Sequence, residues 1–217
     1  MVLGARTATT RRARRPAPRK RTTRKSELTR GSILDAAARV LRRRGYSGTT
    51  LTDIAAEIGM KAGSLYYHFD SRESLVEAVM ELGLARSRQA VEARLRQLPA
   101  RATPLHRLRA AIETHLLSVV AQEHYTSATI KLIWQVPPEI RERQLTTQRA
   151  YGAVWRKLIA DARRARQIRA DLDPSVVRMG ILGALNWAAD WFRAEKLPAQ
   201  RVAGDLATLM IEGLRRR

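Results

Sequence analysis

The stretch that decides the fold is residues 49–75, which read TTLTDIAAEIGMKAGSLYYHFDSRESL. Its first apolar positions recur at the three- and four-residue spacing of one helix face: Leu51, Ile54, Ala55 and Ile58. Thr49 or Thr50 can cap this helix at its start, and Gly59 ends it. A turn of three residues then leads to a second short helix over residues 62–69. Two short helices joined by a Gly-containing turn are the sequence form of a helix-turn-helix.

The second helix of such a pair lies in the DNA major groove, where each base pair shows a distinct pattern of donors and acceptors. Ala62, Gly63 and Ser64 are small and would let the backbone come close to the bases. Further along, Tyr66, Tyr67 and His68 offer hydrogen-bond donors to DNA. The alternative is that they form an aromatic surface whose polar groups already have partners and that has no role in DNA binding. We expect Leu65 and Phe69, four residues apart, to anchor the helix in the core.

Helical periodicity also precedes and follows this pair. Residues 26–44 carry an apolar stripe and end in three arginines before Gly45, an arrangement that suits the negative end of a helix. Asp70 or Ser71 can cap a long helix over residues 72–97. Further helices are predicted over residues 104–121, 125–136, 138–167, 174–194 and 199–214.

Residues 49–75, together with Gly45 and Tyr46, closely resemble the DNA-binding signature of the TetR family of transcriptional regulators. The resemblance implies an all-α fold. It also implies a three-helix DNA-binding domain over residues 26–74 and a helical ligand-binding and dimerisation domain over residues 75–217. The last two helices would pair with those of a second subunit, so that a homodimer reads two half-sites about 34 to 36 Å apart.

The same resemblance implies roles for individual residues. Positions that match Thr50, Tyr66, His68 and Arg72 hold the phosphate backbone, and positions that match Lys61, Ala62, Ser64 and Tyr67 lie nearer the bases. The family usually has Lys where this chain has Arg72, a change that keeps the charge and adds a planar fork. The complete set of predicted DNA-binding residues is Thr50, Thr52, Lys61, Ala62, Gly63, Ser64, Tyr66, Tyr67, His68 and Arg72.

Large apolar side chains with polar tips suit a ligand pocket between helices. The predicted ligand-binding residues are Trp134, Trp155, Trp187, Trp191 and His115. The alternative is packing in the core or the dimer interface for the tryptophans and in the core for His115. Residues 186–192 are similar to a stretch of family members that respond to acyl-CoA thioesters. Arginines that could meet a CoA phosphate, or lie on solvated helix faces, are Arg141, Arg143, Arg149 and Arg156.

The chain carries 41 basic and 20 acidic residues, a formal charge of +21, and no cysteine. Residues 1–25 hold ten basic side chains and no acidic one, so we expect a disordered basic arm that adds DNA affinity or serves as a solubilising tail. Residues 1–44 hold 15 basic and 2 acidic residues, whereas residues 45–74 hold 2 and 4. We therefore expect the arm and the first helix to attract DNA. The choice of DNA sequence should come from a few nearly neutral residues between Lys61 and His68.

Catalysis, metal binding and a cofactor are not expected. His106, His115 and His124 are nine residues apart, which on one helix places successive side chains about 180° apart. No metalloprotease, phosphate-loop or nucleophile-elbow motif occurs, and no stretch could span a membrane. We expect a cytoplasmic, nucleoid-associated homodimeric repressor that a small apolar ligand, such as an acyl-CoA, releases from a DNA operator. An activator with the same fold and a nonspecific nucleic-acid-binding protein are the alternatives.

Overall fold

The computed structural model describes residues 19–216, and in this range the secondary structure is helical apart from one isolated bridge between Ile168 and Arg215. The all-α prediction is confirmed. The helices are α1 (Arg19–Arg44), α2 (Leu51–Glu57), α3 (Ala62–Leu65), α4 (Arg72–Gln97), α5 (Pro104–Ala121), α6 (Glu123–Leu132), α7 (Pro138–Arg164), α8 (Pro174–Trp191) and α9 (Ala199–Leu214). Most of the predicted basic arm, residues 1–18, lies outside the described residues.

Helices α4, α5 and α9 have the bounds that the sequence predicts. Helix α1 begins at Arg19, earlier than the predicted residue 26. Helix α3 ends at Leu65 rather than at residue 69, because the Leu65 carbonyl accepts hydrogen bonds from the amides of both His68 and Phe69 and the chain then turns toward α4. Helix α7 ends at Arg164, ahead of Arg166, whose φ of 55° is left-handed.

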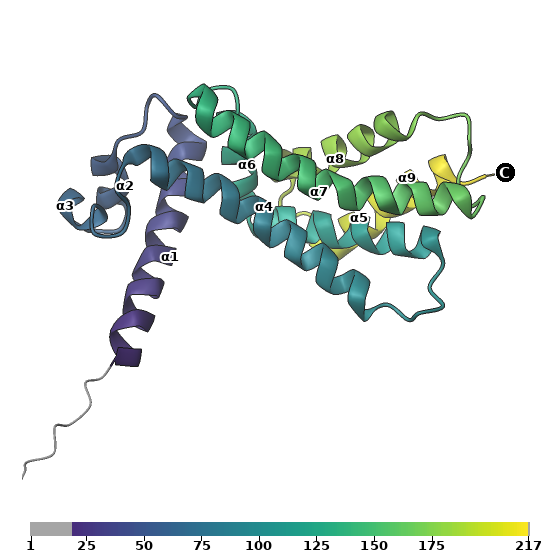
Figure 1. Cartoon of the computed structure of the whole chain (residues 1–217), viewed down its shortest axis with the longest axis horizontal. Coiled ribbons are helices and arrows are strands. Elements are labelled where there is room, and N and C mark those ends of the chain that lie inside the picture. The colour runs from purple at the N-terminus through teal and green to yellow at the C-terminus, as the bar shows by residue number, and fades with distance from the viewer. Residues whose placement is uncertain (1–18, 217) are drawn as a thin grey trace, which may run out of the picture.

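Helices α1, α2 and α3 and the start of α4 lie at one end of the molecule (Figure 1) and form the headpiece. Leu65 and Phe69 are buried in its core, as the sequence predicts. That core also contains residues from α6 and from the segment that follows it: Tyr125, Ala128, Leu132, Ile133 and Val136. The headpiece core is therefore shared with the rest of the chain.

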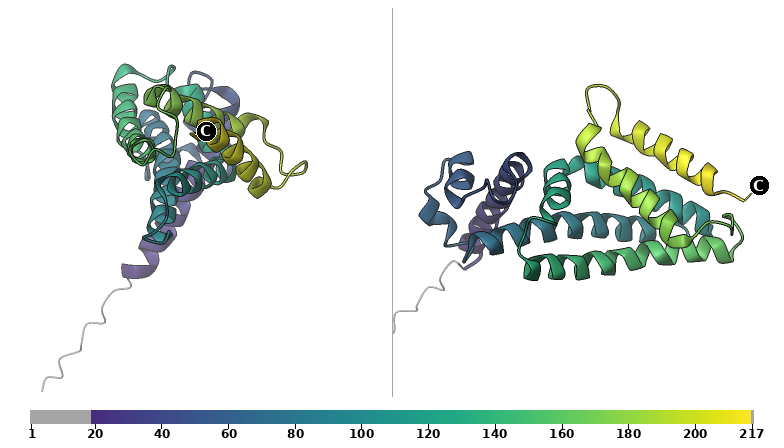
Figure 2. Two further views of the ribbon diagram at one scale, coloured as in Figure 1. Left: turned by 90° about the vertical axis from the view of Figure 1, so that its right-hand side faces the viewer. Right: turned by 90° about the horizontal axis from the view of Figure 1, so that it is seen from above.

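A second core fills the larger body, with side chains from α5, α7, α8 and α9. Helix α4 connects the two cores, with Val76, Val79 and Met80 buried in the first and Val91 in the second. Seen from above, α8 and α9 form one side of the larger body and α7 the opposite side (Figure 2). None of the described helices is both long and apolar enough to cross a membrane.

The turn between α2 and α3 depends on Gly59, whose φ of +64° lies in the left-handed region. The amides of Gly59 and Met60 donate to the carbonyls of Ala56 and Ala55 and so close the end of α2. A Cβ added at Gly59 would meet no atom within 4 Å, so a substitution there costs backbone strain alone.

We predict that Gly59→Ala lowers the free energy of unfolding by about 1 kcal/mol, because an L-residue is strained at this φ. Gly63→Ala is the matched control: a Cβ there also meets nothing within 4 Å, but Gly63 lies inside α3 with no positive φ. The control should not lower stability. Urea denaturation followed by circular dichroism measures both, and equal losses in the two variants would contradict this account of the turn.

Candidate nucleic-acid interface and internal cavity

The start of α2 is fixed by a capping box between Thr50 and Asp53. The Thr50 hydroxyl accepts a hydrogen bond from the Asp53 amide, and the Asp53 carboxylate accepts one from the Thr50 amide. Hydrogen bonds from Thr50, and then from Arg44, hold the pKa of Asp53 below its usual range. Thr50 and Thr52 are exposed at the start of this rigid helix.

The predicted reading surface lies on α3 and the turn after it. Lys61, Gly63 and Ser64 are exposed, and the side chains of Tyr66 and Tyr67 are 59% and 82% exposed. Ala62 and His68 are partly buried, and the rings of His68 and Tyr67 meet edge to face with centroids 5.1 Å apart. Two large exposed aromatic side chains beside small residues give this end of the molecule a surface rich in hydroxyl groups.

The Arg72 side chain is engaged within the protein and is not free to bind a DNA phosphate with all of its donors. Its Nη1 donates to the carbonyls of Tyr46 (3.2 Å) and Thr49 (3.0 Å), and its guanidinium stacks 4.1 Å from the centre of the Tyr46 ring. Its Nε also donates to Glu73. Arg72 therefore holds the loop that carries Thr50, and its contact with a DNA phosphate stays a prediction.

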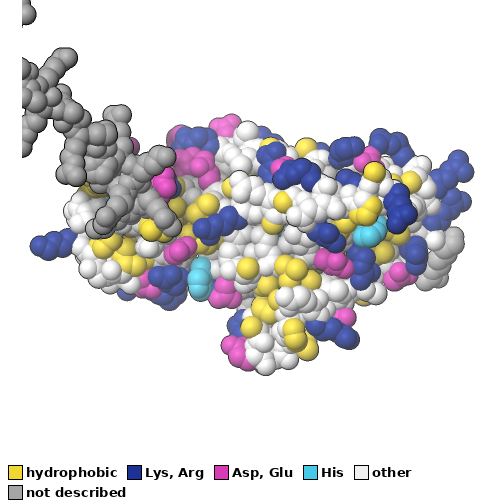
Figure 3. Space-filling view, turned by 90° about the horizontal axis from the view of Figure 1, so that it is seen from below, with side chains coloured by type: hydrophobic (Ala, Val, Ile, Leu, Met, Phe, Trp, Pro, Cys, Tyr) yellow, Lys and Arg dark blue, Asp and Glu magenta, His cyan; other side chains and the backbone are white. Residues whose placement is uncertain are grey.

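The arginines at the end of α1 are also engaged within the protein. Arg39 and Arg43 pair with Glu57, at 3.1 and 2.6 Å, and their hydrogen bonds hold the pKa of that carboxyl below its usual range. Arg44 pairs with Asp53, and Arg42 with Glu123 on α6. On the face shown in Figure 3, Lys and Arg side chains lie along the whole molecule rather than gathering on the headpiece. Three carboxylates therefore engage these four arginines, and the attraction to DNA expected of the first helix stays a prediction.

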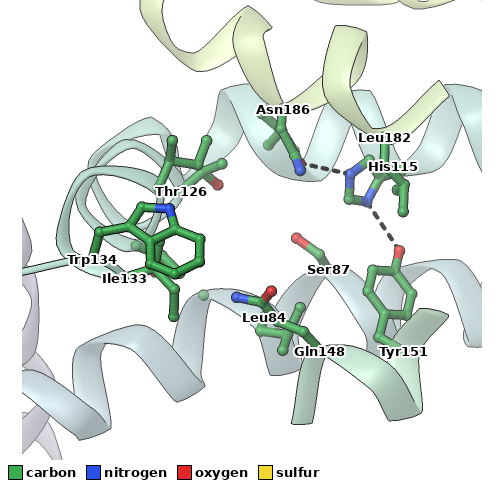
Figure 4. A pocket seen from close by; sticks show the side chains of 14 residues that line it. Leu84, Ser87, His115, Thr126, Ile133, Trp134, Gln148, Tyr151, Leu182 and Asn186 are labelled. Atoms are coloured by element: carbon green, nitrogen blue, oxygen red, sulfur yellow. Dashed lines mark hydrogen bonds between the residues drawn. The ribbon is translucent and has the colours of Figure 1, made fainter. Parts of the chain in front are cut away.

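A partly open cavity of about 290 Å³ lies between α4, α5, α6, α7 and α8. Figure 4 shows its side chains pointing toward a common space from these helices. The lining residues are uncharged: Gly83, Leu84, Ser87, His115, Val119, Thr126, Thr129, Ile130, Ile133, Trp134, Gln148, Tyr151, Leu182 and Asn186. Apolar walls with a few convergent polar groups are typical of small-molecule sites.

His115 forms the centre of a hydrogen-bonded chain across the cavity (Figure 4). Its Nδ1 lies 2.9 Å from the Tyr151 hydroxyl and its Nε2 lies 3.1 Å from Oδ1 of Asn186. Burial lowers the pKa of His115 to about 4, so the ring is neutral near pH 7. An amide oxygen can only accept, so Nε2 carries the proton and Nδ1 accepts from Tyr151.

The structure places two of the five predicted ligand-binding residues at the cavity and three away from it. His115 and Trp134 line the cavity. Trp155 does not line it: this side chain is fully buried behind His115, with ring centroids 5.5 Å apart. Trp187 and Trp191 are 61% and 44% exposed on the outer face of α8, because the inner face of that helix is occupied by residues such as Leu182 and Asn186.

Sequence reasoning missed Tyr151, Asn186, Gln148 and Ser87 as cavity residues. Gln148 and Tyr151 share a helix face with Ile140, Gln144 and Trp155, at a spacing of three and four residues. Polar side chains on an otherwise apolar helix face were the available signal. Within the described residues, no group of three or more potential metal ligands occurs.

Helix α8 presents a continuous strip of small and apolar side chains to the outside. Its members are exposed and recur at a spacing of three or four residues: Val176, Met179, Gly180, Gly183, Ala184, Trp187 and Trp191. On α9, Leu209 is 70% exposed. An exposed apolar strip of this length marks an interaction surface.

Two family models match the chain. One, described as bacterial regulatory proteins of the tetR family, matches residues 33–79, and one described as the tetracyclin repressor-like C-terminal domain matches residues 101–214. The HTH-type transcriptional repressor KstR2 of Mycobacterium tuberculosis is 29% identical over 197 residues, which are 85% of this chain and 92% of KstR2.

Solved structures agree with these matches. The TetR family transcriptional regulator PfmR of Thermus thermophilus is 25% identical, with a TM-score of 0.73 over 85% of this chain and 99% of PfmR. AibR, solved in complex with isovaleryl coenzyme A and operator DNA, is 26% identical, with a TM-score of 0.69 over 86% of this chain and 97% of AibR.

The low pKa of buried His115 predicts a loss of stability in acid. The unfolded chain, with an ordinary histidine pKa near 6.5, binds this proton more readily than the fold, so stability is complete above pH 6.5 and falls as the pH drops toward 4. We expect His115→Gln to lose about 2 kcal/mol less unfolding free energy than the parent between pH 7 and pH 5. His106→Gln, at an exposed position, is the control, and identical pH profiles for all three proteins would contradict the prediction.

Proposed function

The chain belongs to the TetR family of transcriptional regulators, and from that premise we propose that it is a homodimeric repressor that a small ligand releases from its operator. The family is one of DNA-binding regulators, and the repressor KstR2 is similar to this chain over nearly its whole length. The observation that carries the proposal is that one helix, α6, both lines the uncharged cavity and packs into the core of the headpiece.

The surface of α3 supports sequence-specific binding. Lys61, Gly63, Ser64 and Tyr67 are exposed and mostly uncharged, so they suit hydrogen bonds to base edges. Thr50, Thr52, Tyr66 and His68 supply groups at the margins of this surface, where phosphates would lie. Because the nearby arginines are paired with carboxylates, the headpiece would rely on hydrogen bonds more than on net charge.

The exposed strip on α8 supports a homodimer. Gly180, Gly183 and Ala184 would let two copies of α8 approach closely, and Trp187 and Met179 would be buried beside them. A two-fold interface of this kind presents the same surface from both subunits. It would place two headpieces for half-sites about one helical turn, roughly 34 to 36 Å, apart.

Helix α6 gives the ligand a route to the headpiece. Thr126, Thr129 and Ile130 line the cavity, and Ala128 and Leu132 on the same helix are buried in the headpiece core. A ligand weakens operator binding only if it favours one position of the headpieces over another. We propose that an occupied cavity shifts α6 and thereby the spacing of the two headpieces.

An acyl-CoA thioester is the ligand class that we propose first. AibR, a structural neighbour, was solved with isovaleryl coenzyme A and operator DNA. Trp134, at the cavity, is largely exposed and lies 5.7 Å from the guanidinium of Arg141, which would stand near a CoA phosphate. The cavity itself would accept only the acyl part.

Two substitutions that each remove one exposed hydroxyl test the DNA roles. We predict that Tyr66→Phe weakens binding to operator and random DNA by the same factor, about fivefold, because phosphate contacts carry no sequence information. Tyr67→Phe should weaken operator binding by about tenfold and random binding little, because base contacts specify. Gel shifts at one salt concentration, with DNA that flanks the coding region as operator, measure both.

The opposite pattern, with Tyr66 altering preference and Tyr67 acting uniformly, would contradict these roles. An affinity ratio near one between the flanking DNA and random DNA, already in the parent protein, would instead favour a nonspecific binder.

For the dimer, we predict that Trp187→Glu yields a monomer, because a carboxylate cannot be buried unpaired at a two-fold interface. Leu28→Glu is the matched control, since Leu28 is as exposed as Trp187 but lies on α1. Light scattering after size-exclusion chromatography measures the mass of each variant. A dimeric Trp187→Glu protein would place the interface elsewhere.

A further inference from the structure

We infer that the cavity binds an uncharged molecule with a carbonyl group, and that the carbonyl oxygen accepts a hydrogen bond from Nδ2 of Asn186. The inference rests on the proposed function, because it names the class of ligand for the same cavity. It differs from the acyl-CoA proposal in naming the chemical group that is recognised and the residue that binds it: a thioester is one member of the class, and ketones, esters and lactones are others.

The absence of charge in the described lining excludes a charged ligand group inside. All fourteen lining residues are uncharged near pH 7, including His115, the one basic side chain among them, which is 3% exposed. A carboxylate moved into such surroundings loses its hydration and finds no cation there. An ionised ligand group would have to stay outside, near Trp134.

The direction of the hydrogen bonds around His115 determines what the cavity offers. Nε2–H of His115 donates to Oδ1 of Asn186, and the hydroxyl of Tyr151 donates to Nδ1 of His115. The amide oxygen of Asn186 is therefore occupied by His115, which leaves both Nδ2 N–H donors of this lining residue outside that contact. A donor pair held in place by a buried histidine calls for an acceptor on the ligand.

Two hydroxyl-bearing residues, Thr129 and Ser87, also line the cavity. The Thr129 hydroxyl is buried at the cavity and has no hydrogen-bond partner among the described residues. Ser87, another lining residue, already accepts from Nε2 of Gln122 at 2.8 Å and lies 3.1 Å from the Ser118 hydroxyl. Neither hydroxyl is therefore free to bind the ligand, because the Thr129 oxygen has almost no accessible surface and Ser87 is already hydrogen-bonded.

The size of the cavity limits the ligand to a compact molecule. A volume of about 290 Å³ is at the lower end of the range of roughly 300 to 1,000 Å³ that small-molecule sites cover. Leu84, Val119, Ile133 and Leu182 supply the apolar walls. A short or medium acyl chain with one carbonyl group fits this combination of volume and chemistry.

Three probes that share a chain length test the inference: 2-octanone, octanoate and 1-octene. Binding to the full-length dimer is measured by calorimetry at pH 6, 7 and 8. We expect 2-octanone to bind with the same Kd at each pH and at least tenfold more tightly than octanoate at pH 8. Octanoate should weaken about tenfold per pH unit, because either the acid or His115 must take up a proton for it to enter. The ketone should also bind more tightly than 1-octene, which lacks the acceptor.

Asn186→Asp is the sharpest variant, since it keeps an oxygen for His115 and removes both N–H donors. It should abolish the advantage of 2-octanone over 1-octene. Asn186→Ser serves as a second variant, and thermal melts of both confirm that they fold. Octanoate binding as tightly as the ketone without pH dependence, or an unchanged ketone preference in both variants, would overturn the inference.

Two further measurements distinguish failure of this inference from failure of the proposed function. Octanoyl-CoA carries the same chain on a neutral thioester, so its binding would identify thioesters as members of the class, and binding of the ketone alone would remove the acyl-CoA proposal. If none of the probes binds, the cavity is not the ligand site. Gel shifts without any ligand report operator binding independently, so the DNA-binding function can stand while the ligand class fails.

Discussion

The headpiece cannot close its own hydrophobic core, and the structure depends on α6 to complete it. Ala128 and Leu132 of that helix are fully buried against α1 and α4, and Val136 follows in the same core. A DNA-reading unit as small as the headpiece buries little apolar surface by itself. Because the missing side chains come from the ligand-binding part of the chain, the position of the headpiece is set by the position of α6.

Polar contacts fix the same junction at both ends of α6. Near its start, Arg42 of α1 donates to Glu123 at 2.7 Å, and the Tyr125 hydroxyl donates to Asp35 at 2.5 Å. After its end, Oε1 of Gln135 accepts from the Tyr46 amide at 2.9 Å, next to the loop that Arg72 holds. Interfaces packed in this way tend to switch between arrangements rather than deform gradually. A displacement of α6 would therefore move α1 and the reading surface with it.

The sequence predicted the parts of the molecule in which local chemistry decides the outcome. Helix α4, which starts after the cap Ser71 and ends ahead of Pro99, was placed correctly, as was burial of Leu65 and Phe69. The cavity was only partly predicted, because facing helices far apart in sequence bring Ser87, Tyr151 and Asn186 together. The charge count of α1 likewise could not show that four of its arginines meet carboxylates of α2 and α6, because a linear count cannot pair them.

A ligand in the cavity is proposed to move the headpieces by displacing α6. The chain has no cysteine, so Ala56→Cys at an exposed position of α2 gives one spin label on each headpiece. Pulsed electron paramagnetic resonance then measures the distance between the two labels of the dimer, with Ala160→Cys on the outer face of α7 as control. With saturating 2-octanone we expect the distance between the two α2 labels to change and the distance between the two α7 labels to stay the same. Identical α2 distances with and without bound ligand would contradict it.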